Sequence, residues 1–336
     1  MKQAAIWAAI VVGMIAFGVS TYATVGSLRG TRTEIQRPST SLISLPGTIY
    51  VAQGGAIYRL RGGTFKQITP IDGWTQPAAS PDSKQLVAVK EALNWSDLYL
   101  LGTDGEVEAQ LTHNSSRRAE LNHWAFYPHF SPDGSAVFYS YDPKDPNNSY
   151  RVDLAIVSRP ADPSGTLSTS WTEPNQYTGG DANPLPLSAG LIYTKFSIDD
   201  HSQVHSQIWL QAQPDSPGVA LTAAGDDCAQ PAVSPDAKLL AMVCRHGQLR
   251  STQLTLAPLD VSSLSIGTPT VAVSGDLLAS PTFSSSGSTV AYLAPEPSGG
   301  SFQLWAVAVS GTAGSPRQVT RNLGLDSSST PAWVAG

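Results

Sequence analysis

One short segment of the chain gathers side chains of the types that bind metal ions. It spans residues 197–206, and its candidate ligands are Asp199, Asp200, His201 and His205. Carboxylate oxygens and imidazole nitrogens are accepted by divalent metal ions in proteins. The spacing matches no specific metal site, however, and a hairpin loop does not align His201 with His205 as a helix would. The sequence favours a solvated turn here and leaves a metal site as the alternative.

A second segment, residues 114–127, combines basic and aromatic side chains in the sequence NSSRRAELNHWAFY. Tryptophan and arginine are enriched among the residues that dominate binding energy at interfaces. We expect this loop to form a binding surface. Two further tryptophans from nearby loops are expected to lie on the same side of the molecule. The candidate binding residues are Arg117, Arg118, His123, Trp124, Trp95 and Trp74. In the alternative interpretation the loop is solvated and the tryptophans only pack neighbouring parts of the fold together.

The remaining polar patterns do not indicate catalysis. Residues 142–149 are rich in oxygen ligands but lack the spacing and the distal Glu of a calcium loop. Asp226 and Asp227 are typical of turns rather than of an acid–base pair. A net charge of −6 argues against a nucleic-acid surface, which needs a basic face. We therefore predict no catalytic residue, no cofactor and no nucleic-acid partner.

The only two cysteines, Cys228 and Cys244, flank a predicted turn. If Ser234 lies opposite Lys238 in that turn, Cys228 lies opposite Cys244, because each cysteine is six positions outside the turn. Directly opposite residues in antiparallel strands have Cα atoms about 4.5–5.5 Å apart, which a disulfide can bridge. A register shift of one residue would instead place the cysteines on opposite faces. The pair is therefore a disulfide candidate.

One motif recurs along the chain at intervals of 47 to 56 residues. Its copies start at Pro77, Pro128, Pro184, Pro231 and Pro281, and a fragment starts at Pro331. The best copy reads PHFSPDGSAVFYS, in which Ser-Pro-Asp-Gly favours a tight turn between two strands. A strand rich in Tyr, Trp or Leu and a more polar strand come next in most copies. Four strands per repeat indicate one blade of a β-propeller.

The two ends of the chain complement each other. Residues 47–69 supply a second, third and fourth strand with no first strand before them, and residues 330–333 supply a first strand. Together they make one blade, which closes the ring and protects its edges. We therefore predict an all-β fold, a six-bladed β-propeller over residues 47–336 with a shared closing blade.

The pattern P-x-F-S-P-D-G-x-x-[IV]-A-[FY] resembles the repeats of TolB-like β-propellers, also called PD40 or WD40-like repeats. The resemblance covers residues 47–333 and is strongest in the copy at Pro128. It implies a six-bladed propeller that binds partners, usually outside the bacterial cytoplasm. A structural repeat of this kind says little about the ligand.

Residues 1–25 are predicted to form a membrane anchor or signal segment, and residues 26–46 a tether. No charged residue occurs from position 4 to position 25, and a helix of that length would reach about 33 Å, enough to cross a bilayer. The alternative is a cleaved signal peptide. The arginines after this run do not by themselves favour an exported C-terminus. We expect export because N-terminal segments of this kind normally direct the rest of the chain across the membrane.

The sequence thus favours a non-catalytic, membrane-tethered propeller outside the cytoplasm that binds a protein, a peptide or a cell-wall ligand. The alternative is a hydrolase or lyase with its site in the central funnel. A carboxylate pair or a metal at the funnel mouth would favour the enzyme. A pore lined by small and apolar residues would favour the binding scaffold.

Overall fold

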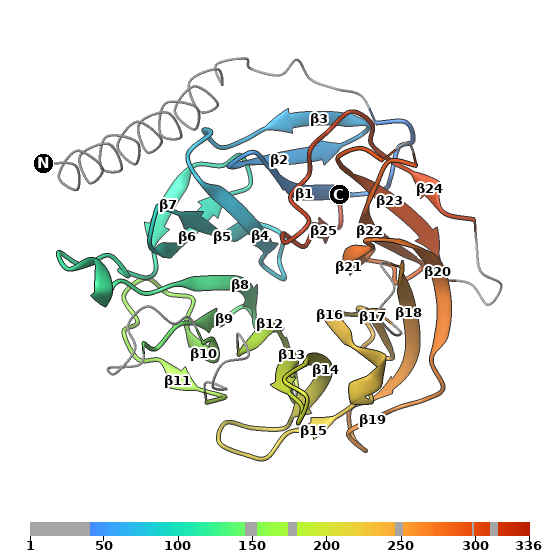
Figure 1. The fold of residues 1–336 in the computed structure, drawn as a ribbon. Helices are drawn as coiled ribbons and strands as arrows, with labels where there is room; N and C mark the ends of the chain where they lie inside the picture. Colours follow the sequence, from blue (N-terminus) through green and yellow to red (C-terminus); the bar gives the residue numbers. More distant parts are fainter. Residues whose placement is uncertain (1–40, 145–152, 174–179, 246–250, 298, 310–314) are drawn as a thin grey trace, which may run out of the picture. The chain divides into compact units, whose positions relative to one another are not determined.

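The computed structural model describes residues 41–144, 153–173, 180–245, 251–297, 299–309 and 315–336. Apart from two three-residue 3-10 helices, η1 (Ala119–Leu121) and η2 (Ala224–Asp226), the regular elements there are β-strands. They form six antiparallel sheets arranged as blades around a central axis (Figure 1). The prediction of an all-β, six-bladed propeller is confirmed.

The strands of each blade are given from the axis outwards. Blade one contains β25 (Ala332–Val334), β1 (Thr48–Gln53), β2 (Ala56–Arg61) and β3 (Thr64–Gln67), and blade two contains β4 (Trp74–Ala79), β5 (Gln85–Glu91), β6 (Ser96–Gly102) and β7 (Val107–Gln110). Blade three contains β8 (Ala125–Phe130), β9 (Ala136–Tyr141), β10 (Ala155–Pro160) and β11 (Thr169–Ser170), and blade four contains β12 (Asp181–Leu187), β13 (Gly190–Ile198), β14 (Val204–Gln211) and β15 (Val219–Ala220). Blade five contains β16 (Cys228–Val233), β17 (Leu239–Cys244), β18 (Ser251–Asp260), β19 (Ser265–Ile266) and β20 (Thr270–Asp276), and blade six contains β21 (Ala279–Phe283), β22 (Thr289–Pro295), β23 (Phe302–Ala308) and β24 (Arg317–Gln318).

The predicted N-terminal anchor lies outside the described residues, as does most of the tether. Among the helices that the structure describes, none is long and apolar enough to cross a membrane.

Blade one is shared between the two ends of the propeller, as predicted. β25 pairs with β1, and Trp333 lies opposite Ile49. The Trp333 side chain is only 8% exposed, and its Nε1 donates a hydrogen bond to Pro46 O at 2.8 Å. It packs in the same core cluster as Leu293 and Leu304 of blade six. The last strand therefore joins the first and last blades, and it buries apolar surface while doing so.

In five of the six blades a threonine lies two residues after the fourth strand, and its hydroxyl group accepts a hydrogen bond from the backbone of the third strand. In blade one, Ile57 N donates to Thr69 Oγ1 at 2.8 Å. The matching pairs in blades two, three, four and six are Leu98–Thr112, Ile156–Thr172, Ile208–Thr222 and Leu304–Thr320. The side chain replaces a strand partner where the chain leaves for the next blade. Blade five differs, because β20 continues to pair with β18 along this stretch.

The repeated turn places its fourth residue in the left-handed backbone region. Gly134 and Gly287 occupy this position with φ of 73° and 71°, as glycine does readily. Ser83 and Ala237 adopt the same conformation with φ of 58° and 56°, although a Cβ atom disfavours it. The Ser-Pro-Asp part of the turn supplies the compensating bonds: Ser234 Oγ, for example, accepts a hydrogen bond from Leu239 N at 2.9 Å.

Candidate functional site

The innermost strands surround an axial channel that holds a cavity of about 540 Å³. Six prolines of the repeats contribute to its wall, namely Pro77, Pro81, Pro231, Pro235, Pro281 and Pro331. Small and apolar residues such as Ala78, Ala232 and Phe283 fill much of the rest. No acidic residue contributes to this wall within the part of the chain that the structure describes.

A ring of bulges lies on the side of the channel that carries the inter-blade loops, where Gln76, Tyr127 and Asn183 line a second, narrow cavity of only about 20 Å³. In β4, β8, β12, β16 and β21 an extra residue precedes the repeat proline and breaks the register with the second strand. The residues at this position are Gln76, Tyr127, Asn183, Gln230 and Ser280, all with φ between 48° and 55°. Sequence reasoning missed them, because a residue before proline is normally extended. The available signal was their shared place before each repeat proline.

The bulges of neighbouring blades are linked by hydrogen bonds. Tyr127 N donates to Gln76 Oε1 at 2.6 Å, and Ser280 N donates to Gln230 Oε1 at 2.9 Å. Gln76 N in turn donates to Ser329 Oγ at 3.0 Å. In each case a side chain of one blade satisfies a backbone group of the next. These bonds offset the backbone strain of the left-handed residues and link neighbouring blades around the channel.

Three titratable groups near the narrow part of the channel have pKa values shifted from their ordinary ones. Burial lowers the pKa of His129, in the channel wall, to about 4, so this imidazole is neutral at pH 7. Burial also raises the pKa of Tyr127, and the charges of Asp326 and Glu91 add to that increase. Burial and the Asp326 charge raise the pKa of Glu91 as well. The negative charges of two carboxylates, neither of which lines the cavity, therefore disfavour ionisation of the Tyr127 hydroxyl group. One of them, Asp326, accepts a hydrogen bond from Thr75 Oγ1 at 2.8 Å.

The connection between β7 and β8 stands on a buried, hydrogen-bonded base. Asn114 Nδ2 donates to Ser96 O at 2.7 Å, and His123 N donates to Asn114 O at 3.0 Å. Asn122 Oδ1 accepts from Ser116 N at 2.6 Å. Asn114, Asn122 and Ser96 are all buried. The tip of this loop projects from the outer edge of the ring, away from the channel (Figure 1).

The predicted basic residues lie on the exposed tip of this loop. Arg117 and Arg118 are both exposed. Arg118 Nε contacts Glu120 Oε1 at 2.8 Å, and the Arg118 side chain is 69% exposed and that of Glu120 40%. An ion pair in such a position contributes little to stability, so the guanidinium group can exchange it for a partner's carboxylate.

The predicted aromatic residues have different environments. His123 stacks on Tyr141 and Trp124 stacks on Phe126, with centroid distances of 5.2 and 5.5 Å, and both are half-buried at the root of the loop. Trp95 is also half-buried, and the adjacent Ser96 bonds to Ala125 through its hydroxyl group at 2.7 Å, which brings this turn against the root of the loop.

Trp74 does not belong to this surface, in contrast to the prediction. Its side chain is 3% exposed and lies edge-on to Tyr99, with 5.3 Å between ring centroids. Lys90 Nζ lies 5.4 Å from the same ring. Trp74 starts β4 and faces blade one, so the interface between blades takes up the whole indole. The packing interpretation is therefore the correct one for Trp74.

The carboxylate of Asp199 is used by the turn that contains it. Its Oδ1 accepts hydrogen bonds from His201 N and Gln203 N at 2.8 and 2.9 Å, and its Oδ2 contacts His205 Nε2 at 3.1 Å. These bonds, led by the one from Gln203, lower the pKa of Asp199 to about 2. His201 and Asp200 point to no common centre: within the described residues, no group of three His, Cys, Asp or Glu side chains could hold a metal ion.

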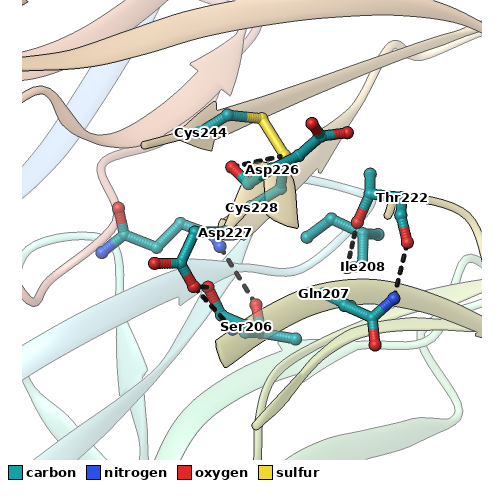
Figure 2. The surroundings of a disulfide bond; sticks show 10 residues. Ser206, Gln207, Ile208, Thr222, Asp226, Asp227, Cys228 and Cys244 are labelled. Carbon is teal, nitrogen blue, oxygen red and sulfur yellow. Dashed lines mark hydrogen bonds between the residues drawn. A yellow bond between two sulfur atoms is a disulfide. The ribbon is translucent and has the colours of Figure 1, made fainter. Parts of the chain in front are cut away.

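Cys228 and Cys244 form a disulfide between β16 and β17, with Cα atoms 4.0 Å apart. Figure 2 shows it beside Ile208 and Thr222 of blade four. The register assumed from the sequence was wrong at the turn, where Ser234 N bonds to Leu239 O rather than facing Lys238. The bulge between Ala229 and Ala232 adds one residue to β16, which compensates for the shifted turn and places Cys228 directly opposite Cys244.

In two other blades the facing residues at the position equivalent to the disulfide make a different contact between the first and second strands. Blade four has a buried Asp181 contacting Lys195 Nζ at 3.2 Å, and blade two has the contact of Lys90 with the Trp74 ring. Burial raises the pKa of Asp181 although the Lys195 charge opposes the shift. An ion pair, a cation–π contact and a disulfide thus serve one structural purpose, which is to tie the first two strands together at the loop rim.

Comparison with solved structures identifies the architecture. TolB from Acinetobacter baumannii matches with a TM-score of 0.62 and 20% identity over 86% of this chain and 67% of that chain. A putative TolB from Agrobacterium tumefaciens matches with a TM-score of 0.59 and 15% identity, over 86% of this chain and 94% of that one. The fold is TolB-like.

The TolB-like fold is shared with proteins of other kinds. Oligogalacturonate lyase from Vibrio parahaemolyticus matches with a TM-score of 0.50 and 11% identity, over 84% of this chain and 83% of that chain. At such identities the likeness concerns the fold alone, since function depends on the residues of a site. No protein-family model matches the chain, and no curated protein matches it by sequence.

Proposed function

We propose that this TolB-like chain is a non-catalytic binding propeller that recognises an acidic protein or peptide, or an anionic cell-envelope glycan. The observation that carries the proposal is the loop between β7 and β8. Its base is buried and hydrogen-bonded, whereas Arg117 and Arg118 at its tip are exposed. Loops held on a rigid scaffold are where binding residues concentrate, and exposed guanidinium groups recognise carboxylates and other anions.

The composition of the channel supports a binding role over a catalytic one. Small, apolar and proline residues form most of its wall, and burial lowers the pKa of His129 to about 4, which makes this imidazole a weaker base than an ordinary histidine. The proposed partner surface comprises the loop tip, Trp124 and the turn that carries Trp95. Leu93 in that turn is 85% exposed and adds apolar contact area.

The second candidate, a hydrolase or lyase, has one observation in its favour. Glu91 and Asp326 interact electrostatically near Tyr127, which lines the narrow part of the channel. A carboxylate pair of this type can supply acid–base chemistry. The test is turnover of glycan and peptide libraries by the wild-type chain and by the Glu91→Gln variant. Turnover that the variant loses would support the enzyme.

The proposal places the propeller outside the cytoplasm, held to a membrane by residues 1–25. The uncharged run in that segment and a disulfide in the propeller both support this location, because disulfides persist in oxidising compartments. Protease added to intact cells is expected to release the propeller. Release only after lysis would show the opposite orientation.

The binding surface is tested with the intact, membrane-tethered protein. Partners are first captured by pull-down from the native cell envelope. The triple variant Arg117→Ala, Arg118→Ala, Trp124→Ala is expected to remain folded and to lose most partner recovery. Arg321→Ala is the matched control, because Arg321 is an exposed arginine in the connection from blade six to the closing blade. Equal recovery by the triple variant and the control would exclude this surface.

A further inference from the structure

Each blade presents one equivalent pair of side chains to the blade before it. The pair consists of a third-strand residue and the second-strand residue opposite it. The third-strand residue comes one position after the residue whose backbone N–H bonds to the threonine that follows the fourth strand. In blades one, two, three, four and six the pairs are Val51–Tyr58, Ala88–Tyr99, Tyr139–Val157, Tyr193–Trp209 and Tyr292–Trp305. All five contain at least one aromatic ring, and that ring packs in the core between two blades.

Blade five breaks this pattern. Its equivalent pair is Met242–Thr255. The assignment follows from blade four, where the aromatic pair lies two residues from Lys195–Gln207, the pair that corresponds to Cys244–Gln253 in blade five. The core cluster between blades four and five contains no aromatic side chain among the described residues. An interface that elsewhere takes up a tyrosine or tryptophan ring is here built from aliphatic residues, one methionine and the disulfide.

A cavity occupies the place of the missing ring. It has a volume of about 440 Å³, and its wall includes Leu221 of blade four together with Met242, Thr255, Val271 and the Cys228–Cys244 disulfide of blade five. Small-molecule pockets typically enclose about 300–1,000 Å³ and combine an apolar lining with a few polar groups. This cavity has that size and composition, and it lies between two blades, not in the axial channel.

The Thr255 hydroxyl group is the polar group without a partner in this wall. Thr255 is 5% exposed, and its Oγ1 has no hydrogen-bond partner among the described residues. Leaving such a group unsatisfied costs about 1–3 kcal/mol. A hydroxyl group can both donate and accept, so a ligand N–H or O–H would remove this penalty.

We propose that the cavity between blades four and five binds a small aromatic molecule with one polar hydrogen, a phenol or an indole. The ring replaces the tyrosine or tryptophan of the other blades, and its O–H or N–H donates to Thr255 Oγ1. The sulfur atoms of Met242 and the disulfide contact the ring, an interaction that favours aromatic ligands over saturated ones of equal size. This site is independent of the partner surface on the β7–β8 loop.

The experiment measures binding of indole and p-cresol to the full chain in detergent by calorimetry, with cyclohexanol as a saturated control. Saturable binding of at least one aromatic probe, and at least tenfold weaker binding of cyclohexanol, is expected. Thr255→Trp is expected to fill the cavity and to weaken aromatic binding at least tenfold. Val271→Phe fills it from the partly exposed outer wall, so it tests the site even if the first variant fails to fold. Thr64→Trp, on the exposed outer strand of blade one, is the matched control and is expected to bind like the wild type.

Three outcomes would overturn the proposal. The first is no saturable binding of either aromatic probe up to about 10 mM, which corresponds to less than about 3 kcal/mol of binding free energy. The second is unchanged aromatic affinity in a folded Thr255→Trp or Val271→Phe variant. The third is equal affinity for p-cresol and cyclohexanol, which would mean that the cavity takes any apolar molecule and that the missing ring does not define its ligand.

Discussion

Cys228 lies opposite Cys244 because β16 has a bulge: its residues Cys228–Val233 face only the five residues Leu240–Cys244 of β17. The extra residue sits at the Gln230–Pro231 bulge, between two stretches of regular pairing. Without it the turn at Ser234 would leave the cysteines one residue out of register and on opposite faces. The bulge beside the channel therefore also makes the disulfide possible.

Removal of the disulfide is expected to lower the free energy of unfolding by about 3 kcal/mol, because a bridge between residues 16 positions apart restricts the unfolded chain. The measurement is urea unfolding of the Cys228→Ala, Cys244→Ala variant and of the wild type. A reducing agent should lower the stability of the wild type by a similar amount and leave the variant unchanged. Equal stability of wild type and variant would contradict this prediction.

Closure of the ring is expected to depend on Trp333. Replacing it by alanine removes a buried indole and the hydrogen bond to Pro46 O, so the free energy of unfolding should fall by about 3–5 kcal/mol. Deletion of residues 329–336 should cost more, because it also exposes the edge of β1. Deletion of only Ala335 and Gly336, which are exposed, is the control and should leave the melting temperature unchanged. Normal melting after the longer deletion would show that the ring closes without β25.

Ala237→Gly is expected to stabilise the propeller by about 1 kcal/mol. Ala237 has φ of 56° at the turn position where Gly287 serves in blade six, and glycine relieves the left-handed strain at some cost in unfolded-chain entropy. The reverse change, Gly287→Ala, should destabilise by a similar amount. Thermal unfolding of both variants checks the pair. A lower melting temperature for Ala237→Gly would mean that the entropy cost is larger than the strain.

Stability is expected to fall as the pH drops from about 6.5 towards 4, in part through His129. An unfolded histidine has a pKa near 6.5, whereas burial lowers the folded pKa of His129 to about 4. Below pH 6.5 the unfolded chain therefore binds a proton that the folded chain does not, and this contribution is fully lost below about pH 4. His129→Gln should reduce the difference in unfolding free energy between pH 7 and pH 5. An unchanged difference would assign the acid sensitivity to other groups.

The sequence alone determined the architecture, because every repeat carries its own local instructions. The tight turn after the repeat proline, which reads Ser-Pro-Asp in three copies, and the apolar strands beside it define a blade without reference to distant residues. The split of the closing blade was also predictable, since residues 47–69 lack a first strand and residues 330–333 supply one. The exposure of Arg117 and Arg118 likewise needed only the polar composition of a long loop.

The tertiary structure decided everything that depends on contacts between blades. The left-handed residue before each repeat proline contradicts the local preference for extended backbone, and it persists because side chains such as Gln76 and Gln230 bond to the next blade. Trp74 is buried because blade one covers it, which its place near a predicted loop did not reveal. The cavity beside Thr255 is likewise a property of two facing sheets, since an absent ring leaves space only where the neighbouring blade does not move in to fill it.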